Sequence, residues 1–207
     1  MIEKLAYSLG RNDEEPNIEL AKNLAKTKNK KGIKEIVDGL SNPKAQIAND
    51  CIKVLYEIAE ISPELISEYT DIFIQLLKAK NCRLVWGAMT ALTKITSLNP
   101  EKVFNNLELI IRAYEKGKVI TVDNSISVFA ELVKVDKKFE KKVFPIIIAH
   151  LEKCRPKELG QHAERAFICV NKNNSKIFKE TLLKRRDSLT EAQKKRVDKL
   201  LRVLGKV

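Results

Sequence analysis

The sequence is poor in the residues that form turns and in those that most often carry catalysis. Its 207 residues include 7 glycines, 6 prolines and 2 histidines, and aromatic residues make up 6%. Sandwiches and barrels of β-strands need a turn signal roughly every 8–12 residues, so this scarcity argues against them. The sequence contains no glycine-rich phosphate loop, no G-x-S-x-G elbow and no H-E-x-x-H motif, which makes a hydrolase or a kinase a poor interpretation.

Long apolar stretches are also missing. No run reaches the roughly 18 apolar residues of a membrane span, and the N-terminal stretch MIEKLAYSLGRNDEEP is charged at both ends without an apolar centre. We therefore expect a soluble, cytoplasmic protein that does not bind membranes. The cysteines lack C-x-x-C spacing and lie among apolar neighbours, so we expect buried thiols and no disulfides. They are Cys51, Cys82, Cys154 and Cys169.

Apolar residues at helical spacing are abundant, and their pattern repeats. Hydrophobic residues make up 44% of the chain and charged residues 32%, as is typical of a folded, soluble protein. One apolar set follows the i, i+3, i+4, i+7 spacing of a helix, and each member recurs 37 residues later. The first set is Ile47, Cys51, Val54, Leu55, Ile58 and Ile61, and the second is Leu84, Ala88, Ala91, Leu92, Ile95 and Leu98.

The repeat continues past the end of each helix. ISPELI at 61–66 and LNPEKV at 98–103 lie 37 residues apart and share an apolar residue, a small polar residue, proline and glutamate. Ser62 and Asn99 are suitable N-caps, the prolines suit the first helical position, and the glutamates favour the positive end of the helix dipole. Each stretch therefore predicts the start of a new helix.

A period of this length with two helices per unit predicts an all-α fold, a right-handed α-solenoid of about five helix-pair repeats. We expect one domain over residues 1–207, with capping helices in 1–31, repeats over 32–171 and a basic capping repeat over 172–207. The expected helices are 2–9 and 17–29, followed by the pairs 32–40 and 43–61, 63–80 and 82–98, 100–116 and 119–135, 138–153 and 156–171, and 175–188 and 190–204.

The second helix of each unit resembles that of the HEAT repeat, which reads roughly D-P-x-x-x-V-R-x-x-A-x-x-A-L-x-x-I. SNPKAQIANDCIKVLYEIA matches this apolar frame, and so does NCRLVWGAMTALTKI. Ala48 and Val85 stand where the family usually has the arginine of a polar ladder between repeats. The resemblance covers about residues 32–204, does not separate HEAT from armadillo repeats, and implies a binding scaffold.

We therefore predict a non-catalytic scaffold or adaptor that needs no cofactor and binds a macromolecule through the concave face made by the second helices. Mixed polarity on that face favours a protein partner. Neither the identity of the partner nor the oligomeric state follows from the sequence. The positions predicted for this face are Asn49, Lys53, Thr90, Lys94, Ser127 and Glu131.

The alternative is nucleic-acid binding, because the net charge of +12 is uneven. Residues 1–155 contain 25 basic and 21 acidic residues, which gives a net charge of +4. Residues 156–207 contain 14 basic and 6 acidic residues, which gives a net charge of +8. This basic end is able to bind phosphates or an acidic protein, or to serve as the solvated cap of a last repeat. Its predicted binding residues are Lys184, Arg185, Arg186, Lys195, Lys199 and Arg202, and Thr190 with Gln193 predicts a capping box.

A catalytic alternative rests on one stretch. TVDNSIS resembles the segment that carries the catalytic aspartate in DNA alkylation-repair glycosylases built of HEAT-like helices, which points to Asp123, with Arg165 on a later helix. The family's aromatic residues near that aspartate are missing, because Val119 stands there and Trp86 lies in another repeat. We favour a surface role for Asp123 and packing between repeats over partner binding for Trp86.

The histidines and two cysteines are the nearest thing to a metal set. His150 and Cys154 are one helical turn apart, and His162 and Cys169 are two turns apart on the next predicted helix. Facing helices would then present four nitrogen and sulfur ligands, as tetrahedral zinc requires. Core packing is the favoured interpretation, so no metal is predicted.

Overall fold

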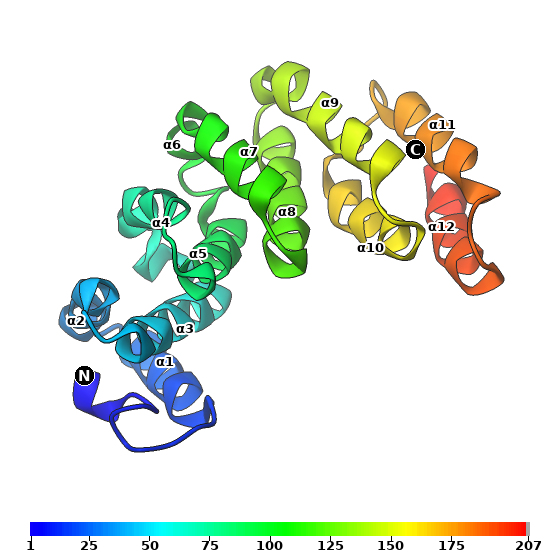
Figure 1. The fold of residues 1–207 in the computed structure, drawn as a ribbon. Coiled ribbons are helices and arrows are strands. Elements are labelled where there is room, and N and C mark those ends of the chain that lie inside the picture. Colours follow the sequence, from blue (N-terminus) through cyan, green and yellow to red (C-terminus); the bar gives the residue numbers. More distant parts are fainter. Residues whose placement is uncertain (206–207) are drawn as a thin grey trace. The chain divides into compact units, whose positions relative to one another are not determined.

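A computed structural model describes residues 1–205, in which all regular elements are helices and no strand occurs (Figure 1). The chain forms two compact units, Met1–Ser125 and Ile126–Val207. The all-α repeat fold is confirmed, and one domain over the whole chain stays a prediction. No helix among the described residues is long and apolar enough to cross a membrane.

The first unit is built from two layers of helices. In one layer α1, α3 and α5 lie side by side, while α2 packs against α3 and α4 against α5 (Figure 1). The largest buried side chains between them include Ile36, Leu55 and Phe73. The elements are η1 (Ile2–Lys4), α1 (Glu15–Thr27), α2 (Lys30–Asp38), η2 (Gly39–Ser41), α3 (Ala45–Ile61), η3 (Pro63–Leu65), η4 (Ser67–Tyr69), α4 (Thr70–Leu76), α5 (Cys82–Ile95), α6 (Pro100–Asn105), α7 (Leu107–Lys116) and α8 (Val119–Val135), which runs on into the second unit.

The second unit repeats this two-layer packing. Helix α9 packs against α11, and α10 packs against α12. Phe139 and Phe178 are fully buried between them. The elements are α9 (Lys137–Lys153), α10 (Pro156–Ala166), η5 (Phe167–Cys169), α11 (Ser175–Arg186) and α12 (Glu191–Leu204).

The repeating apolar positions form the core, with two exceptions. All members of both sets are buried except Ile61 and Leu98, which are 49% and 47% exposed. These two residues stand where a helix ends or has just ended, so the helical spacing no longer directs them inward. Three cysteines are buried, whereas Cys82 is exposed on the first turn of α5, so its predicted burial is wrong; all four are free thiols.

The stretches at 61–66 and 98–103 start new helices, as predicted, but their polar residues do not act as the predicted N-caps. Pro63 and Pro100 take the first helical positions, although the first of these helices is a 3-10 turn. Neither N-cap side chain caps its own helix. Asn99 instead donates to the carbonyl of Ser67 at 2.9 Å and to the hydroxyl of Thr70 at 3.1 Å. It therefore ties its repeat to the preceding one.

Side-chain acceptors limit helix formation at the N-terminus. A helix was expected over 2–9, but only a 3-10 turn forms before the chain bends. The amide of Ala6 donates to Asn17 at 3.0 Å, and that of Tyr7 donates to Asp50 at 2.8 Å. These amides would otherwise continue a helix. At the other end, the capping box of α12 forms as predicted between Thr190 and Gln193.

Candidate functional site

The polar positions predicted for a concave face bond to neighbouring helices. On α3, Asn49 accepts a hydrogen bond from the side-chain amide of Asn81 at 2.8 Å. On α5, Thr90 accepts one from Asn124 at 2.7 Å. Both bonds join one repeat to the next. The first unit thus has a polar ladder between repeats, although it lacks the arginine that usually builds one.

Two lysines of the predicted face are also held by carboxylates. Lys53 is only 7% exposed and pairs with Glu57 at 2.7 Å and with Glu14 at 3.1 Å. Burial alone would lower the pKa of Lys53, but the hydrogen bond with Glu57 helps to raise it above the ordinary value. Lys94 pairs with Glu60 at 2.7 Å. These ammonium groups stabilise the stack, and their use by a partner stays a prediction.

In the second unit, Ser127 accepts a hydrogen bond from Arg165 at 2.9 Å, and Glu131 lies 3.6 Å from Lys134. The arginine that the glycosylase resemblance singled out is therefore bonded to a hydroxyl of α8. Asp123 is partly buried on α8 and is not among the residues that line the pocket described next.

The first unit contains a pocket of about 720 Å³, here called the groove, which none of the predicted site residues lines. It lies where the turn after α4 and the start of α5 meet the end of α7 and the start of α8. Trp86, Val85 and Leu109 contribute apolar walls, and Val119 and Ile120 are about half exposed at its side. Exposed apolar surface of this kind, concentrated in a concavity, is typical of a binding site.

Cations line the groove, and no described acidic residue lines it with them. No aspartate or glutamate is among its described lining residues. Five exposed cations line it, and within residues 1–205 none of them forms an ion pair with a carboxylate. Converging charges of one sign at a concave surface raise the local concentration of oppositely charged ligands. The five are Lys78, Lys80, Arg112, Lys116 and Lys118.

The same turn in two successive repeats supplies four of these cations. Lys-Ala-Lys at 78–80 and Lys-Gly-Lys at 116–118 both connect the first helix of a repeat to the second. At Gly117 a Cβ atom would stand 2.7 Å from the carbonyl oxygen of Ala113, so the tight turn requires glycine. A Lys-x-Lys pattern recurring at 38 residues was the signal in the sequence that could have indicated the groove.

Trp86 packs against a neighbouring repeat, as predicted, and it also lines the groove. Its side chain is partly buried, with its ring centre 5.6 Å from that of Tyr56. The guanidinium of Arg83 lies 5.5 Å from the same ring. Trp86 also lines the groove. It therefore packs between repeats, and its use by a partner stays a prediction.

The arginines of the basic end are largely engaged within the second unit. Arg185 donates to the carbonyls of Leu151 and Cys154, both at 2.8 Å, at the C-terminal end of α9. Arg186 forms a two-bond pair with Asp198, at 2.7 and 2.9 Å. These bonds anchor α11 to α9 and to α12. Two of the six residues predicted to bind phosphate therefore already have structural bonds.

The other predicted residues of the basic end lie on the surface. Lys184, Lys195 and Lys199 are exposed and form no ion pair with described residues, while Arg202 donates to the backbone of Asp198 at 3.3 Å. Binding of nucleic acid by these residues stays a prediction.

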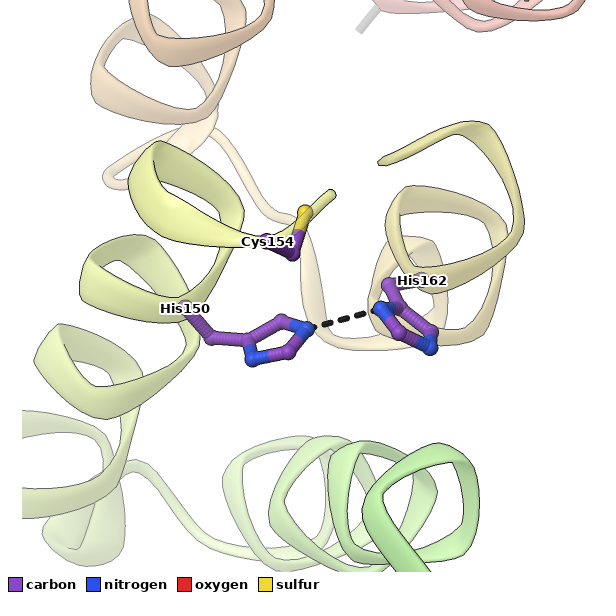
Figure 2. A group of neighbouring side chains, drawn as sticks. All are labelled: His150, Cys154 and His162. Carbon is purple, nitrogen blue, oxygen red and sulfur yellow. Dashed lines mark hydrogen bonds between the residues drawn. The ribbon is translucent and has the colours of Figure 1, made fainter. Parts of the chain in front are cut away.

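Three of the four possible metal ligands meet between α9 and α10. The ligand atoms of His150, Cys154 and His162 all lie within 4.8 Å of one another, and all three residues are buried. Figure 2 shows the two imidazole rings facing each other, joined by a hydrogen bond of 2.7 Å between Nε2 of His150 and Nδ1 of His162. Cys169 does not join this group, and its thiol donates to the carbonyl of Ala166 at 3.1 Å.

Neither models of protein families nor curated protein sequences match this chain. Solved structures do. An engineered protein matches with a TM-score of 0.64 and 18% identity, over 99% of this chain and 96% of its own. A designed armadillo repeat protein in complex with the peptide (KR)4 matches with a TM-score of 0.70 and 12% identity, over 92% of this chain and 91% of its own. Another designed armadillo repeat protein matches with a TM-score of 0.68 and 12% identity, over 99% of this chain and 100% of its own. The chain therefore has an armadillo- and HEAT-like helical-repeat fold.

Proposed function

We propose that this protein is a non-catalytic binding scaffold whose groove takes an acidic, partly apolar segment of a partner protein. The observation that carries this proposal is the set of five exposed cations, without a carboxylate among them, that lines a largely apolar cavity. An isolated set of like charges is unfavourable for the folded protein itself. It becomes favourable when a ligand of opposite charge is bound.

The chemistry of the groove favours a peptide over a nucleic acid. Single-stranded nucleic acids are commonly held by several aromatic side chains on which successive bases stack, and Trp86 is the single aromatic residue among the described lining. A peptide with alternating acidic and apolar side chains matches both parts of the groove. Its carboxylates would approach the lysines, and its apolar side chains would contact Val119 and Ile120.

A solved relative offers a useful contrast. The designed armadillo repeat protein that matches this fold holds the basic peptide (KR)4. The groove described here is itself lined by cations, so its ligand would be an acidic peptide in place of a basic one. Binding through the predicted concave face, and binding of nucleic acid through the basic C-terminal end, stay separate predictions.

The sole tryptophan provides the test, because Trp86 lines the groove. We would titrate the protein with a peptide of alternating glutamate and leucine and follow tryptophan fluorescence, with a lysine–leucine peptide of equal length as control. We expect a saturable change with the acidic peptide alone, which weakens as salt is added because exposed charges are screened. An equal response to both peptides, or none to either, would contradict the proposal.

A further inference from the structure

We propose that His150, Cys154 and His162 form a binding site for a zinc ion between α9 and α10. The three side chains offer two imidazole nitrogens and one sulfur, a donor set that suits zinc and related transition metals. Their ligand atoms lie within 4.8 Å of one another, and all three residues are buried. This site is independent of the groove, which belongs to the first unit.

The geometry needs only small movements. In a tetrahedral zinc site with bonds of about 2.0–2.3 Å, ligand atoms stand roughly 3.3–3.8 Å apart. The two histidine nitrogens are now 2.7 Å apart and would separate slightly, with the ion taking the place of the hydrogen that joins them. The sulfur of Cys154 would move closer by about 1 Å.

The local sequence holds the three ligands in place. His150 and Cys154 are one turn apart at the end of α9, and Pro156 starts α10 two residues later, so His162 faces them from the adjoining helix (Figure 2). The carbonyls of Leu151 and Cys154 are both bound by Arg185 of α11. This anchorage fixes the end of α9 on which two of the ligands stand.

A fourth coordination position would be filled by water. Cys169, the fourth ligand considered from the sequence, lies outside the group. Zinc sites with three protein ligands and one water are well known, and they keep one exchangeable position. In this unit the ion would join the end of α9 to α10 and stabilise the folded form, since metal that binds the native state alone raises its stability.

Cobalt is the probe that distinguishes this site from a simple hydrogen bond between histidines. We would add Co²⁺ to the full-length protein after treatment with a chelator and record its absorption spectrum. A bound cobalt ion with a thiolate ligand gives a sulfur-to-metal band in the near ultraviolet, together with the visible bands of a four-coordinate ion. We expect both, saturating at about one equivalent and abolished by an excess of Zn²⁺.

Variants assign the ligands. Cys154→Ser should remove the near-ultraviolet band and weaken zinc binding by at least about 100-fold, the upper end of the loss that follows from changes outside the ligand set. Cys169→Ser is the matched control, because it also alters a buried thiol at the end of the same hairpin and should keep both signals. If the unaltered protein gives no cobalt spectrum, or Cys154→Ser gives the same spectrum, the histidines form only a hydrogen bond and the proposal is wrong. The first of these readings needs no variant, so a failure of Cys154→Ser to fold would not obscure it.

Discussion

The groove of the first unit and the basic end of the second are both rich in cations, but they use them differently. At the basic end, Arg185 and Arg186 bind carbonyls and a carboxylate of neighbouring helices. Around the groove, five cations surround an apolar cavity without ion-pair partners among the described residues. The part of the chain with the higher net charge is therefore not the part that contains the groove.

The chemistry of the side chains explains this difference. A guanidinium presents several donors in a fixed plane and holds two acceptors at once, so the arginines of α11 and α12 join helices. Lysine ends in a compact, strongly hydrated charge on a flexible chain, and four of the five groove cations are lysines. Lys184, Lys195 and Lys199 are exposed like the groove lysines, but none of them lines the groove.

The largest effect on stability is expected at Arg185. Replacing it in Arg185→Met removes two charge-assisted hydrogen bonds to the end of α9 and leaves two carbonyls without that donor. We expect a loss of about 3 kcal/mol in the free energy of unfolding, measured with a chemical denaturant. Its exposed neighbour provides the control, since Lys184→Met should change stability by about 0.5 kcal/mol or less. Equal effects of the two substitutions would show that Arg185 does not hold the unit together.

Replacing one glycine in each unit by alanine compares how tightly the helices of the two units pack. A Cβ atom at Gly87 would stand 2.6 Å from Cγ1 of Ile52 in the core, whereas one at Gly160 would stand 2.7 Å from Cδ of the flexible Arg196 side chain. Overpacking costs about 1–3 kcal/mol, and alanine in place of glycine returns about 1 kcal/mol of helix propensity. Gly87→Ala should therefore destabilise by about 1 kcal/mol, and Gly160→Ala by about 0.5 kcal/mol or less. Thermal unfolding of both variants checks this, and a larger loss at Gly160 would contradict it.

The smallest expected effect is on the pH dependence of stability. The hydrogen bond from Arg196, at 2.7 Å, lowers the pKa of Glu164 below its ordinary value of 4.5. A carboxyl group whose pKa is lowered by folding contributes stability that is fully present when the pH is above the ordinary pKa. That stability is lost as the pH falls through the lowered pKa of the folded state. Because the pair is exposed, we expect Glu164→Gln to cost about 0.5 kcal/mol at neutral pH and nothing in strong acid. A deficit that persists unchanged in acid would mean that lost packing, not charge, causes it.

Local pattern was enough to predict most of the helices, but not their interruptions. The helix expected over 63–80 is divided into η3, η4 and α4, and the helix expected over 100–116 is divided into α6 and α7. The 37-residue apolar period placed Ala88 and Leu92 in the core, and the capping box at Thr190 starts α12, because these features depend on residues close in sequence. The short helix expected at the N-terminus failed for the opposite reason. Its amides are taken by Asn17 and Asp50, which lie 11 and 43 residues away from the amides they bind.

The functional surfaces depend on partners that are distant in sequence. Arg186 meets Asp198, 12 residues away, and Arg185 meets the carbonyl of Leu151, 34 residues away, so no helical spacing rule reveals that they are engaged. The groove arises because two turns in successive repeats meet. Counting charges along the sequence therefore pointed to the basic end and missed the groove.

One comparison of two triple variants tests the central claim, that an acidic peptide binds to the cations of the groove and not to those of the basic end. The first combines Lys80→Gln, Arg112→Gln and Lys116→Gln, and the second, which removes the same number of charges from the basic end, combines Lys184→Gln, Lys195→Gln and Lys199→Gln. At about 0.7 kcal/mol for each lost charge contact, the first should weaken binding of the glutamate–leucine peptide about 30-fold at low salt. The second variant should weaken binding of the peptide by less than about threefold, because it lowers only the overall positive potential of the protein. If the second variant loses as much affinity as the first, the groove is not the binding site.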